Sequence, residues 1–254
     1  MKKEMKTKEL IEFLNAYLEA DKFQDYAPNG LQVEGSDEVK IVALGVSASL
    51  EFIEKARAIG ADTLLVHHGW FWKGEPSPVV GLKRRRLGAV IEGGLNLLAY
   101  HLPLDAHAVS GNNAELARLL GLTIESRTGF LDLLHVGCLA DGPMTAQAFA
   151  ERVETVLGRK PQLFGDPEKT VSRIGWCSGA AQSDLLEAAA LGCELFLSGE
   201  VREATPYEAR ETGCVYLAAG HYATEQFGIQ ALGRVLEREF PELKCVFIPV
   251  DNPV

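Results

Sequence analysis

Short apolar runs alternate with helical patterns along the first half of the chain, and this alternation constrains the fold more than any other feature of the sequence. The apolar runs of strand length lie at residues 40–48, 63–66 and 95–100. The segments with helical spacing lie at residues 49–61, 82–94 and 112–121. A helix between successive strands carries the chain back to where the next strand can start. The order therefore predicts an α/β fold with mostly parallel strand pairing.

The second half of the chain repeats much of this pattern. Residues 173–200 and 41–68 each contain an apolar strand, a small-residue turn, an alanine-rich helix, a glycine, an acidic residue and a short strand. Residues 213–221 likewise resemble residues 94–101. Such self-similarity indicates internal duplication, so we expect two similar, interlinked α/β lobes. The two predicted lobes are residues 1–125 and 126–254.

The sequence contains no recognisable targeting or membrane-spanning segment. Residues 1–20 have an amphipathic helical spacing and lack the continuous apolar stretch of a signal peptide. No run elsewhere approaches the roughly 18 apolar residues of a membrane span. The five cysteines are widely spaced and form no C-x-x-C motif, which is typical of reduced thiols. We therefore expect a cytoplasmic protein with no membrane partner.

The net charge of the chain disfavours nucleic acid and anionic membranes as partners. A formal net charge of −10 argues against broad binding to nucleic acid or to an anionic membrane. The local exception is the basic run KRRR at residues 83–86. This run is either a solvated helix start or a contact for a phosphate or a partner subunit.

Histidines gather at the ends of predicted strands. Four of the six histidines directly follow an apolar run: His67, His68, His101 and His221. Two of these begin an H-x-x-x-[D/E] pattern, which pairs His101 with Asp105 and His221 with Glu225. In an open α/β sheet the carboxyl ends of the strands converge on one crevice. These side chains are therefore candidate metal ligands.

The spacing of these residues suits a pair of metal ions. His221 and Glu225 lie four residues apart in a predicted helix and so share one face near its first turn. Pro103 separates His101 from Asp105, so we expect that pair on a loop. Adjacent strand residues point to opposite faces. A turn at Gly69 would let His67 and His68 each address a different cation, with a carboxylate bridging the two.

The chemistry of the candidate ligands restricts the metal only loosely. Imidazole and carboxylate donors without a thiolate suit Zn, Fe, Mn, Ni or Co. The expected cofactor is thus two divalent metal ions per subunit, of undetermined identity.

Each of these residues also has a structural interpretation. A lone strand-end histidine is more often a hydrogen-bonded structural residue, and Asp105 or Glu225 alone could be a turn cap or a helix-start charge. The coincidence of three clusters favours metal binding. For His107 we expect a structural or supporting role, and for His135 a place in the core or an interface.

The aromatic residues of the segment HHGWFW line a substrate pocket or pack in the core: Trp70, Phe71 and Trp72.

Taken together, several motifs resemble the Nif-three-like family, also called GTP cyclohydrolase 1 type 2 homologues. The motifs are APNGLQVEG, LLVHHGWFWKGE, AYHLPLDAH with GNNAELARLLG, LFLSGEV and GHYATEQFG, and they run from about residue 10 to about residue 250. The resemblance implies two interlinked α/β domains, a dinuclear metal site and a ring-shaped homohexamer. It further implies that the C-terminal part of the second lobe returns two ligands to the metal site.

The resemblance also assigns roles to the candidate ligands. His68 and Asp105 would bind one metal, His67 and His221 the other, and Glu225 would bridge both; His101 would be an extra or supporting ligand. The chain departs from the usual family pattern at a few positions. Many members have Pro at the position of Gly69, Arg at Gln226, and Asp and His in the segment where this chain has Glu200 and Tyr207. The metal site therefore matches better than the substrate-facing side.

Two functions of different class remain open. The first is a metal-dependent hydrolase of nucleotide or purine-like substrates, such as one that opens the imidazole ring of GTP. The second is a non-catalytic metal-binding, metal-handling or scaffold protein, because the sequence has no recognisable nucleophile or nucleotide-phosphate motif. Binding of DNA in the lumen of a ring is disfavoured by the net charge of −10. The expected partners are further copies of the chain and a nucleotide substrate.

Overall fold

The computed structural model describes residues 5–254, which form two compact units. The first unit comprises the described residues up to Leu104 together with Ile229–Asp251, and the second comprises Asp105–Gly228 with Asn252–Val254. This division differs from the predicted continuous lobes 1–125 and 126–254. The reason lies in the last long helix, α9 (His221–Glu239), whose later apolar residues Ile229, Leu232 and Leu236 belong to a core of the first unit.

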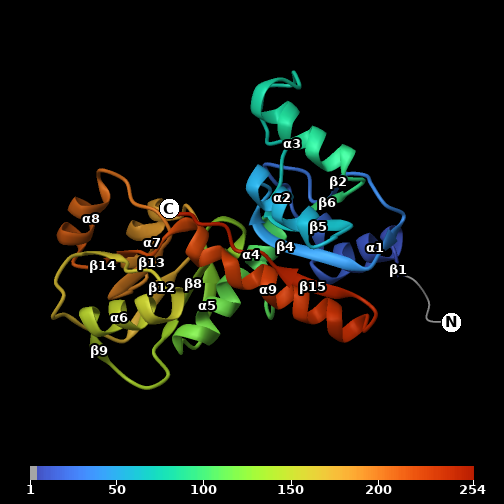
Figure 1. The fold of residues 1–254 in the computed structure, drawn as a ribbon. Coiled ribbons are helices and arrows are strands. Elements are labelled where there is room, and N and C mark those ends of the chain that lie inside the picture. The colour runs from blue at the N-terminus through green and yellow to red at the C-terminus, as the bar shows by residue number, and fades with distance from the viewer. Residues whose placement is uncertain (1–4) are drawn as a thin grey trace. The chain divides into compact units, whose positions relative to one another are not determined.

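The first unit contains a mostly parallel sheet, as the sequence predicts. In spatial order its strands are β15 (Lys244–Phe247), β4 (Ile41–Ser47), β5 (Thr63–His68), β6 (Asn96–Ala99) and β2 (Gly30–Val33). Only β2 runs antiparallel to its neighbour. Its helices include α1 (Thr7–Tyr17), α2 (Leu50–Ala58) and α3 (Gly81–Glu92), and its short elements are β1 (Met5–Lys6), β3 (Glu38–Val39) and the 3-10 helix Ala20–Lys22. The strand and helix predictions for residues 40–100 are thus confirmed (Figure 1).

Both faces of this sheet are covered. Leu65 of β5 lies in one buried cluster with residues of α1 and of the later part of α9. Its neighbours Leu64 and Val66 lie in another cluster with residues of α2. A strand buried on both faces reads as a continuous apolar run, and this explains the sequence TLLV before the histidines.

The second unit contains a mixed sheet. In spatial order its strands are β10 (Gln162–Phe164), β14 (Val215–Ala218), β13 (Leu195–Ser198), β12 (Arg173–Trp176), β8 (Leu134–Cys138) and β7 (Ser126–Thr128). Pairs β12–β13 and β13–β14 are parallel, whereas the three other pairs are antiparallel. The prediction of mostly parallel pairing therefore holds for the first unit and fails for the second.

Helices accompany this sheet. They are α5 (Asn112–Leu120), α6 (Ala146–Leu157), α7 (Leu185–Ala190), α8 (Thr205–Thr212) and the start of α9; the minor elements are β9 (Met144–Thr145), β11 (Thr170–Val171) and the 3-10 helices Phe130–Asp132 and Gln182–Asp184. The short helix α4 (Leu102–Ala106) and the long helix α9 each begin in one unit and end in the other.

Each unit holds the same parallel core. The order β4–α2–β5–α3–β6 in the first unit matches β12–α7–β13–α8–β14 in the second, and in both the three strands lie in sequence order. This shared topology agrees with the internal duplication expected from the sequence.

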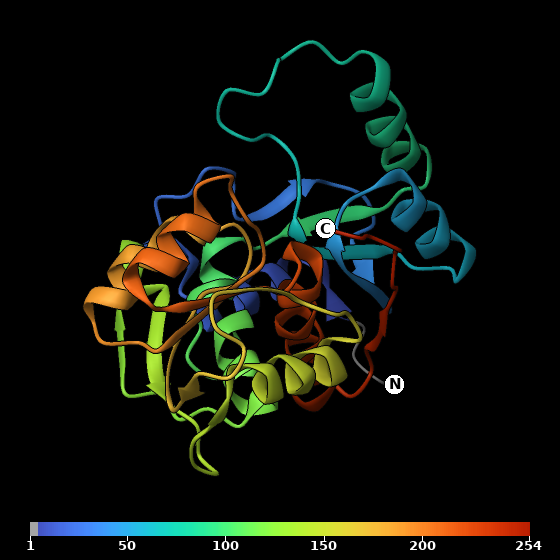
Figure 2. The same ribbon diagram turned by 90° about the vertical axis from the view of Figure 1, so that its left-hand side faces the viewer.

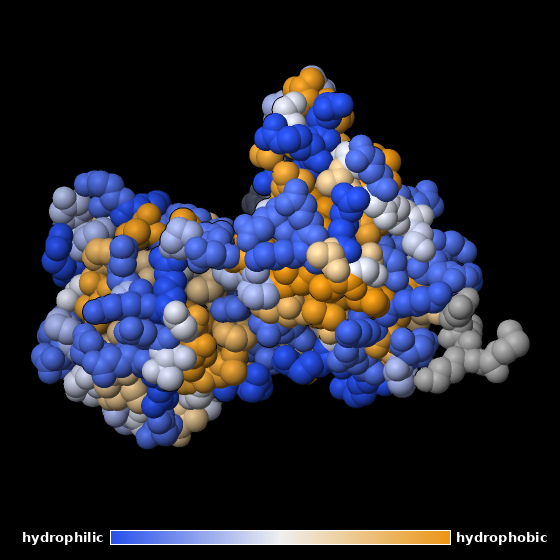
Figure 3. All heavy atoms as spheres, viewed as in Figure 1, coloured by the Kyte–Doolittle hydropathy of each residue, from blue (hydrophilic) through white to orange (hydrophobic). Residues whose placement is uncertain are grey.

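Helix α3 stands away from the sheet of its own unit (Figures 1 and 2). Only Val90 of the helix is buried, whereas Leu82 and Ile91 of the helix and the preceding residue Val80 are exposed. In Figure 3 orange and blue residues are mixed over this projecting part. Among residues 5–254, no helix is long and apolar enough to cross a membrane.

Candidate metal centre

Three histidines of the first unit lie together, and we call them the three-histidine group: His67, His68 and His101. His67 and His68 are the last residues of β5, and His101 follows β6. Because these neighbouring strands are parallel, their carboxyl ends meet at one edge. The ring centroids are 4.4 to 5.5 Å apart, and one ring nitrogen from each histidine lies within 4.8 Å of the other two.

A neighbour in the first unit holds the Nδ1 atom of each ring. Nδ1 of His67 lies 3.0 Å from the carbonyl oxygen of Tyr100, and Nδ1 of His68 lies 3.3 Å from Oγ of Ser47. Nδ1 of His101 lies 2.8 Å from Oδ1 of Asp25. A carbonyl or carboxylate oxygen only accepts, so His67 and His101 donate from Nδ1, and a neutral ring then has its lone pair on Nε2. Nε2 is therefore the atom that would bind a metal.

Asp25 supports the group and was not predicted from the sequence. Its carboxylate accepts the backbone N–H groups of Tyr26 and Leu102, the side-chain amide of Asn29 and the ring of His101. Burial alone would raise the pKa of this carboxyl, but the hydrogen bonds from His101 and Asn29 lower the pKa to about 2. The buried carboxylate is therefore ionised at neutral pH.

The motif APNGLQVEG positions the strand ends. Oδ1 of Asn29 accepts the backbone N–H of His101 at 2.8 Å. The side chain of Gln32 accepts the N–H of Trp70 at 2.7 Å and donates to the carbonyl of Trp70 at 3.1 Å. A Cβ on Gly69 would lie 2.2 Å from Oε1 of Gln32. The backbone of Gly69 is not in the left-handed region, and the absence of a side chain at this position allows the close approach of Gln32.

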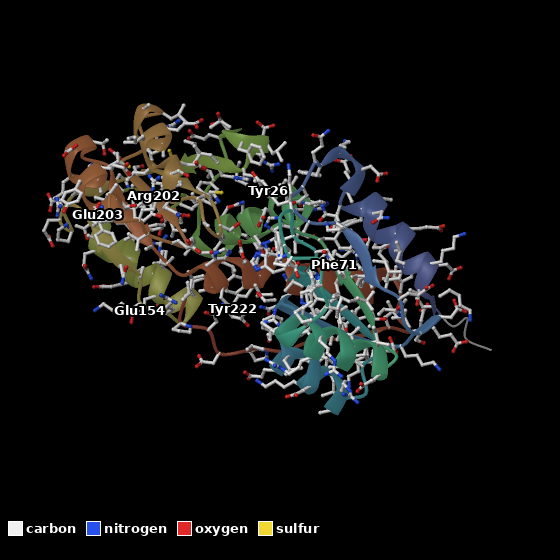
Figure 4. All side chains as sticks on the ribbon, turned by 90° about the horizontal axis from the view of Figure 1, so that it is seen from above. Tyr26, Phe71, Glu154, Arg202, Glu203 and Tyr222 are labelled. Carbon is white, nitrogen blue, oxygen red and sulfur yellow. The ribbon has the colours of Figure 1, made fainter. Side chains whose placement is uncertain are left out.

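The three aromatic residues after the histidines have different roles. Trp70 is buried and donates from Nε1 to the carbonyl of Ala48 at 3.0 Å, so it packs in the core. Trp72 contacts His101 edge to face, with ring centroids 4.9 Å apart at 85°. Phe71 has a left-handed backbone with φ 64° and is partly exposed (Figure 4). Only Trp72 therefore borders the histidines closely.

In the second unit Glu225 lies close both to Asp105 and to His221, and we call these three residues the mixed group. His221 begins α9, and its Nε2 lies 3.1 Å from Oε2 of Glu225 one turn later. Its Nδ1 lies 2.7 Å from Oε1 of Glu200. Burial alone would lower the pKa of His221, but the Glu225 and Glu200 carboxylates raise the pKa to about 9. This arrangement stabilises a positive charge, whether a proton or a metal cation.

Asp105 is held by residues that the sequence did not single out as site residues. It lies in the helix α4 and not in the expected loop. Its Oδ1 accepts from the side chains of Asn112 at 2.8 Å and Ser178 at 3.0 Å, and its backbone carbonyl accepts from Asn113. Both asparagines are fully buried. One carboxylate oxygen of Asp105 lies within 4.8 Å of one of Glu225, so the carboxylates converge.

The small-residue turn at 177–181 leaves space for Glu225 of the mixed group. Three of its backbone N–H groups are already hydrogen-bonded and so are not available to a phosphate. The backbone N–H groups of Ser178, Gly179 and Ala181 donate to side chains of the second unit. A Cβ on Gly179 would lie 2.2 Å from Oε1 of Glu225. The absence of a side chain at Gly179 therefore leaves the space that Glu225 occupies.

Replacing Gly179 with alanine is expected to weaken metal binding at least about tenfold. The new Cβ would displace Glu225, and the left-handed backbone, φ 65°, would cost roughly 1 to 2 kcal/mol of stability. Gly192→Ala is the matched control, because Gly192 has φ 79° and no atom within 4 Å of its added Cβ. Calorimetric metal titration should show weakened binding for Gly179→Ala only; equal affinity in both variants would contradict this account.

The remaining histidines have structural roles, as expected. Nδ1 of His107 accepts the N–H groups of Val109 and Ser110, which stabilises a turn. His135 is buried in β8, and its Nδ1 donates to the carbonyl of Leu133 at 2.9 Å. Of the basic run at 83–86, Lys83 pairs with Glu75 at 3.1 Å. All five cysteines are free thiols, in agreement with the sequence.

The fold and these groups define an α/β protein with imidazole and carboxylate clusters that could hold metal ions. Residues 5–253 match the model of the family described as Duf34/NIF3 (NGG1p interacting factor 3). The chain belongs to this family. It is 46% identical over 247 residues to a protein of Allochromatium vinosum and 44% identical over 251 residues to one of Escherichia coli K12, both named GTP cyclohydrolase 1 type 2 homolog. The alignments cover 97% and 98% of this chain and 96% and 100% of those proteins.

Solved structures agree with this assignment. The protein ybgI, described as of unknown function, superposes with a TM-score of 0.94 at 44% identity and covers 98% of this chain and 100% of its own. A protein of Thermus thermophilus gives 0.88 at 36% identity over 98% of this chain and 100% of its own. A Bacillus cereus protein related to NIF3 gives 0.88 at 14% identity, with 99% coverage of both chains, and shows the shared fold alone.

Proposed function

We propose that this protein binds two divalent metal ions per subunit and acts as a metal-dependent hydrolase of nucleotide or purine-like substrates. In this proposal His68 and Asp105 bind one ion, His67 and His221 bind the other, and Glu225 bridges both. The observation that carries the proposal is the surroundings of His221, because the carboxylates of Glu200 and Glu225 on its two ring nitrogens create a preference for positive charge within the second unit.

Several of the proposed ligands lie close in sequence to the points where the chain passes from one unit to the other. The chain passes from the first unit to the second between Leu104 and Asp105, inside α4, and returns between Gly228 and Ile229, inside α9. Each crossing therefore lies within about one helical turn of proposed ligands. The donors are nitrogen and oxygen only, and this set suits Zn, Fe, Mn, Ni or Co.

The proposed chemistry follows from the metals and from the names of the relatives. Two neighbouring metal ions supply an activated water and a Lewis acid for a hydrolytic reaction. The residues of this chain hold and orient the ligands: Asp25 through His101, Glu200 through His221, and Asn112 and Ser178 through Asp105. The relatives named GTP cyclohydrolase 1 type 2 homolog suggest GTP as the first substrate to test.

The test is turnover of GTP by protein loaded separately with Zn, Fe, Mn, Ni and Co. Opening of the imidazole ring of GTP, and hydrolysis of a phosphodiester substrate in a separate incubation, are followed by chromatography, and His68→Ala is the control. We expect at least one metal to support turnover that His68→Ala lacks. No turnover with any metal, or equal turnover in the variant, would contradict the hydrolase proposal.

A metal-handling or scaffold role is the second candidate. Three backbone N–H groups of the turn at 177–181, those of Ser178, Gly179 and Ala181, donate to side chains of the second unit and so are not free to bind a phosphate, which favours a role without nucleotide chemistry. Transfer of loaded metal to a chelating acceptor separates the candidates. Labile metal without turnover would favour handling, and inert metal without turnover would favour a scaffold.

We further propose a homohexameric ring that functions in the cytoplasm. Val79, Val80, Leu82 and Ile91 on and beside α3 are exposed apolar side chains, which favours contact with further copies of the chain. The five free thiols suit a reducing compartment. Light scattering should give six times the subunit mass of 27.6 kDa; a monomer mass at micromolar concentration would contradict the ring.

A further inference from the structure

Phe71, three residues after His68, is held in an unfavourable backbone conformation. Its φ of 64° lies in the left-handed region, which is rare for a bulky side chain and persists only where surrounding contacts hold it. The neighbouring Trp70 is buried and Trp72 lies edge to face on a histidine ring, but Phe71 is 36% exposed. Burial in the core therefore does not account for this conformation, and strain of this kind is typical of binding sites.

Hydrogen bonds and an ion pair fix the loop that carries Phe71. The backbone N–H of Lys73 donates to the carbonyl of Tyr26 at 2.7 Å. The carboxylate of Glu75 pairs with Nζ of Lys83 on α3 at 3.1 Å. The same Nζ lies 5.5 Å from the centre of the Phe71 ring, within the range of a cation–π contact. The loop therefore presents the ring in one position, and a ligand need not order the loop in order to bind there.

A second basic side chain shares a face of α3 with Lys83. Arg86 follows Lys83 by three residues and precedes the buried Val90 by four, so all three lie on one side of the helix. Within residues 5–254, Nε of Arg86 is buried and has no hydrogen-bond partner. A buried donor without an acceptor is unfavourable, and an oxygen of an anionic ligand would satisfy it. A guanidinium group suits phosphate especially well, because it can donate two parallel hydrogen bonds.

The aromatic ring and the basic face of the helix together select the ligand. We propose that Phe71, Lys83 and Arg86, which we call the purine site, bind a purine nucleotide whose base stacks on Phe71 and whose phosphate contacts Arg86. A base stacks on an aromatic ring through its face, and the two rings of a purine cover more of that ring than a pyrimidine does. The basic residues are needed because a chain with a net charge of −10 otherwise repels a nucleotide. The inference rests on the proposed function and deepens it, since it assigns the residues that recognise the substrate.

The test is equilibrium dialysis of metal-free protein with GTP, guanosine and UTP, so that binding is measured without turnover. We expect Phe71→Ala to weaken the binding of GTP and of guanosine at least about 10-fold, the loss typical of one stacked base. Phe71→Leu keeps an apolar side chain without an aromatic face and should show a similar loss. Arg86→Gln should weaken GTP binding about 10-fold and leave guanosine unchanged, because guanosine carries no phosphate. UTP should bind the wild type at least about 5-fold more weakly than GTP.

Phe130→Ala is the matched control for Phe71. Phe130 is also an exposed phenylalanine, and it lies in the second unit beside Leu131, whose φ of 51° is likewise left-handed. Its replacement should leave the affinity for GTP unchanged. Alanine with a left-handed backbone is no more strained than phenylalanine, so Phe71→Ala is expected to fold. If it does not, Phe71→Leu carries the test.

The outcomes separate this inference from the proposed function. No binding of GTP by the metal-free wild type, unchanged affinity in Phe71→Ala, or an equal loss in Phe130→Ala would overturn the purine site. No loss of GTP binding in Arg86→Gln, or an equal loss for guanosine, would overturn the phosphate contact. Equal affinity for UTP and GTP would overturn the preference for purines.

Measurements on the metal-loaded protein complete the separation. Turnover of GTP with the same KM in the wild type and in Phe71→Ala would overturn the purine site and leave the hydrolase standing. Binding of GTP that depends on Phe71, without turnover in the presence of any metal, would overturn the hydrolase and leave the purine site standing.

Discussion

Replacing Glu225 with glutamine is expected to reduce metal affinity by more than about 100-fold, beyond the 10- to 100-fold loss typical of residues that only support a ligand. The change keeps the shape of the side chain but removes the charge of the proposed bridging carboxylate. Nε2 of His221 lies 3.1 Å from that carboxylate, which helps to raise the pKa of His221 to about 9 against the effect of burial. The pKa of His221 should therefore fall in the variant, and this can be followed by NMR in metal-free protein.

Glu239→Gln provides the control for this experiment. Glu239 ends the same helix and is exposed, so its replacement should leave the metal content and the pKa of His221 unchanged. Metal content at wild-type level in Glu225→Gln would remove this residue from the proposed ligand set.

Acid is expected to destabilise the protein through His135 by up to about 3 kcal/mol. Burial lowers the pKa of His135 to about 4, a shift that its hydrogen bond to Leu133 opposes and nearby Arg127 reinforces. An unfolded histidine has a pKa near 6.5. Between these values the unfolded chain binds a proton that the folded chain does not, so stability falls as the pH falls from about 6.5 to about 4. Below that window this group causes no further change.

Urea unfolding at a series of pH values checks the prediction against His135→Gln, whose amide can still donate to the carbonyl of Leu133. The free energy of unfolding of the wild type should fall more steeply than that of the variant between pH 6.5 and 4. Parallel profiles over this window would show that His135 does not cause the acid sensitivity.

The strands and helices could be predicted from the sequence because their signals are local. The apolar run before His67 and the small-residue turns bounded the elements of the first unit to within a few residues. The pairing direction in the second unit could not be predicted in the same way, since antiparallel β8 and β10 are chosen by tertiary contacts and not by a periodic pattern. The unit boundary was missed because α9 continues through it with one uninterrupted helical pattern.

The grouping of His67, His68 and His101 could be predicted because the carboxyl ends of neighbouring parallel strands lie at the same edge of a sheet. The residues that hold those ligands could not. Asp25 is hydrogen-bonded to His101 although the two lie 76 positions apart in the sequence, and Ser178 is hydrogen-bonded to Asp105 across 73 positions. Asn112 begins α5 at the residue where the helical pattern starts, but its side chain donates to Asp105, and that contact could not be predicted from the pattern. Glu200 was noticed only as a departure from the family pattern, and the structure shows it bound to His221.

The most direct test of the central claim is a crystal structure of the metal-loaded protein with anomalous scattering at the absorption edge of the bound metal. The account predicts two anomalous peaks per subunit, roughly 3.5 to 4 Å apart as in other two-metal sites, with Glu225 between them and His67, His68, Asp105 and His221 at about 2 Å ligand distances. Loaded protein with a single peak, or with peaks bound by other residues, would contradict it.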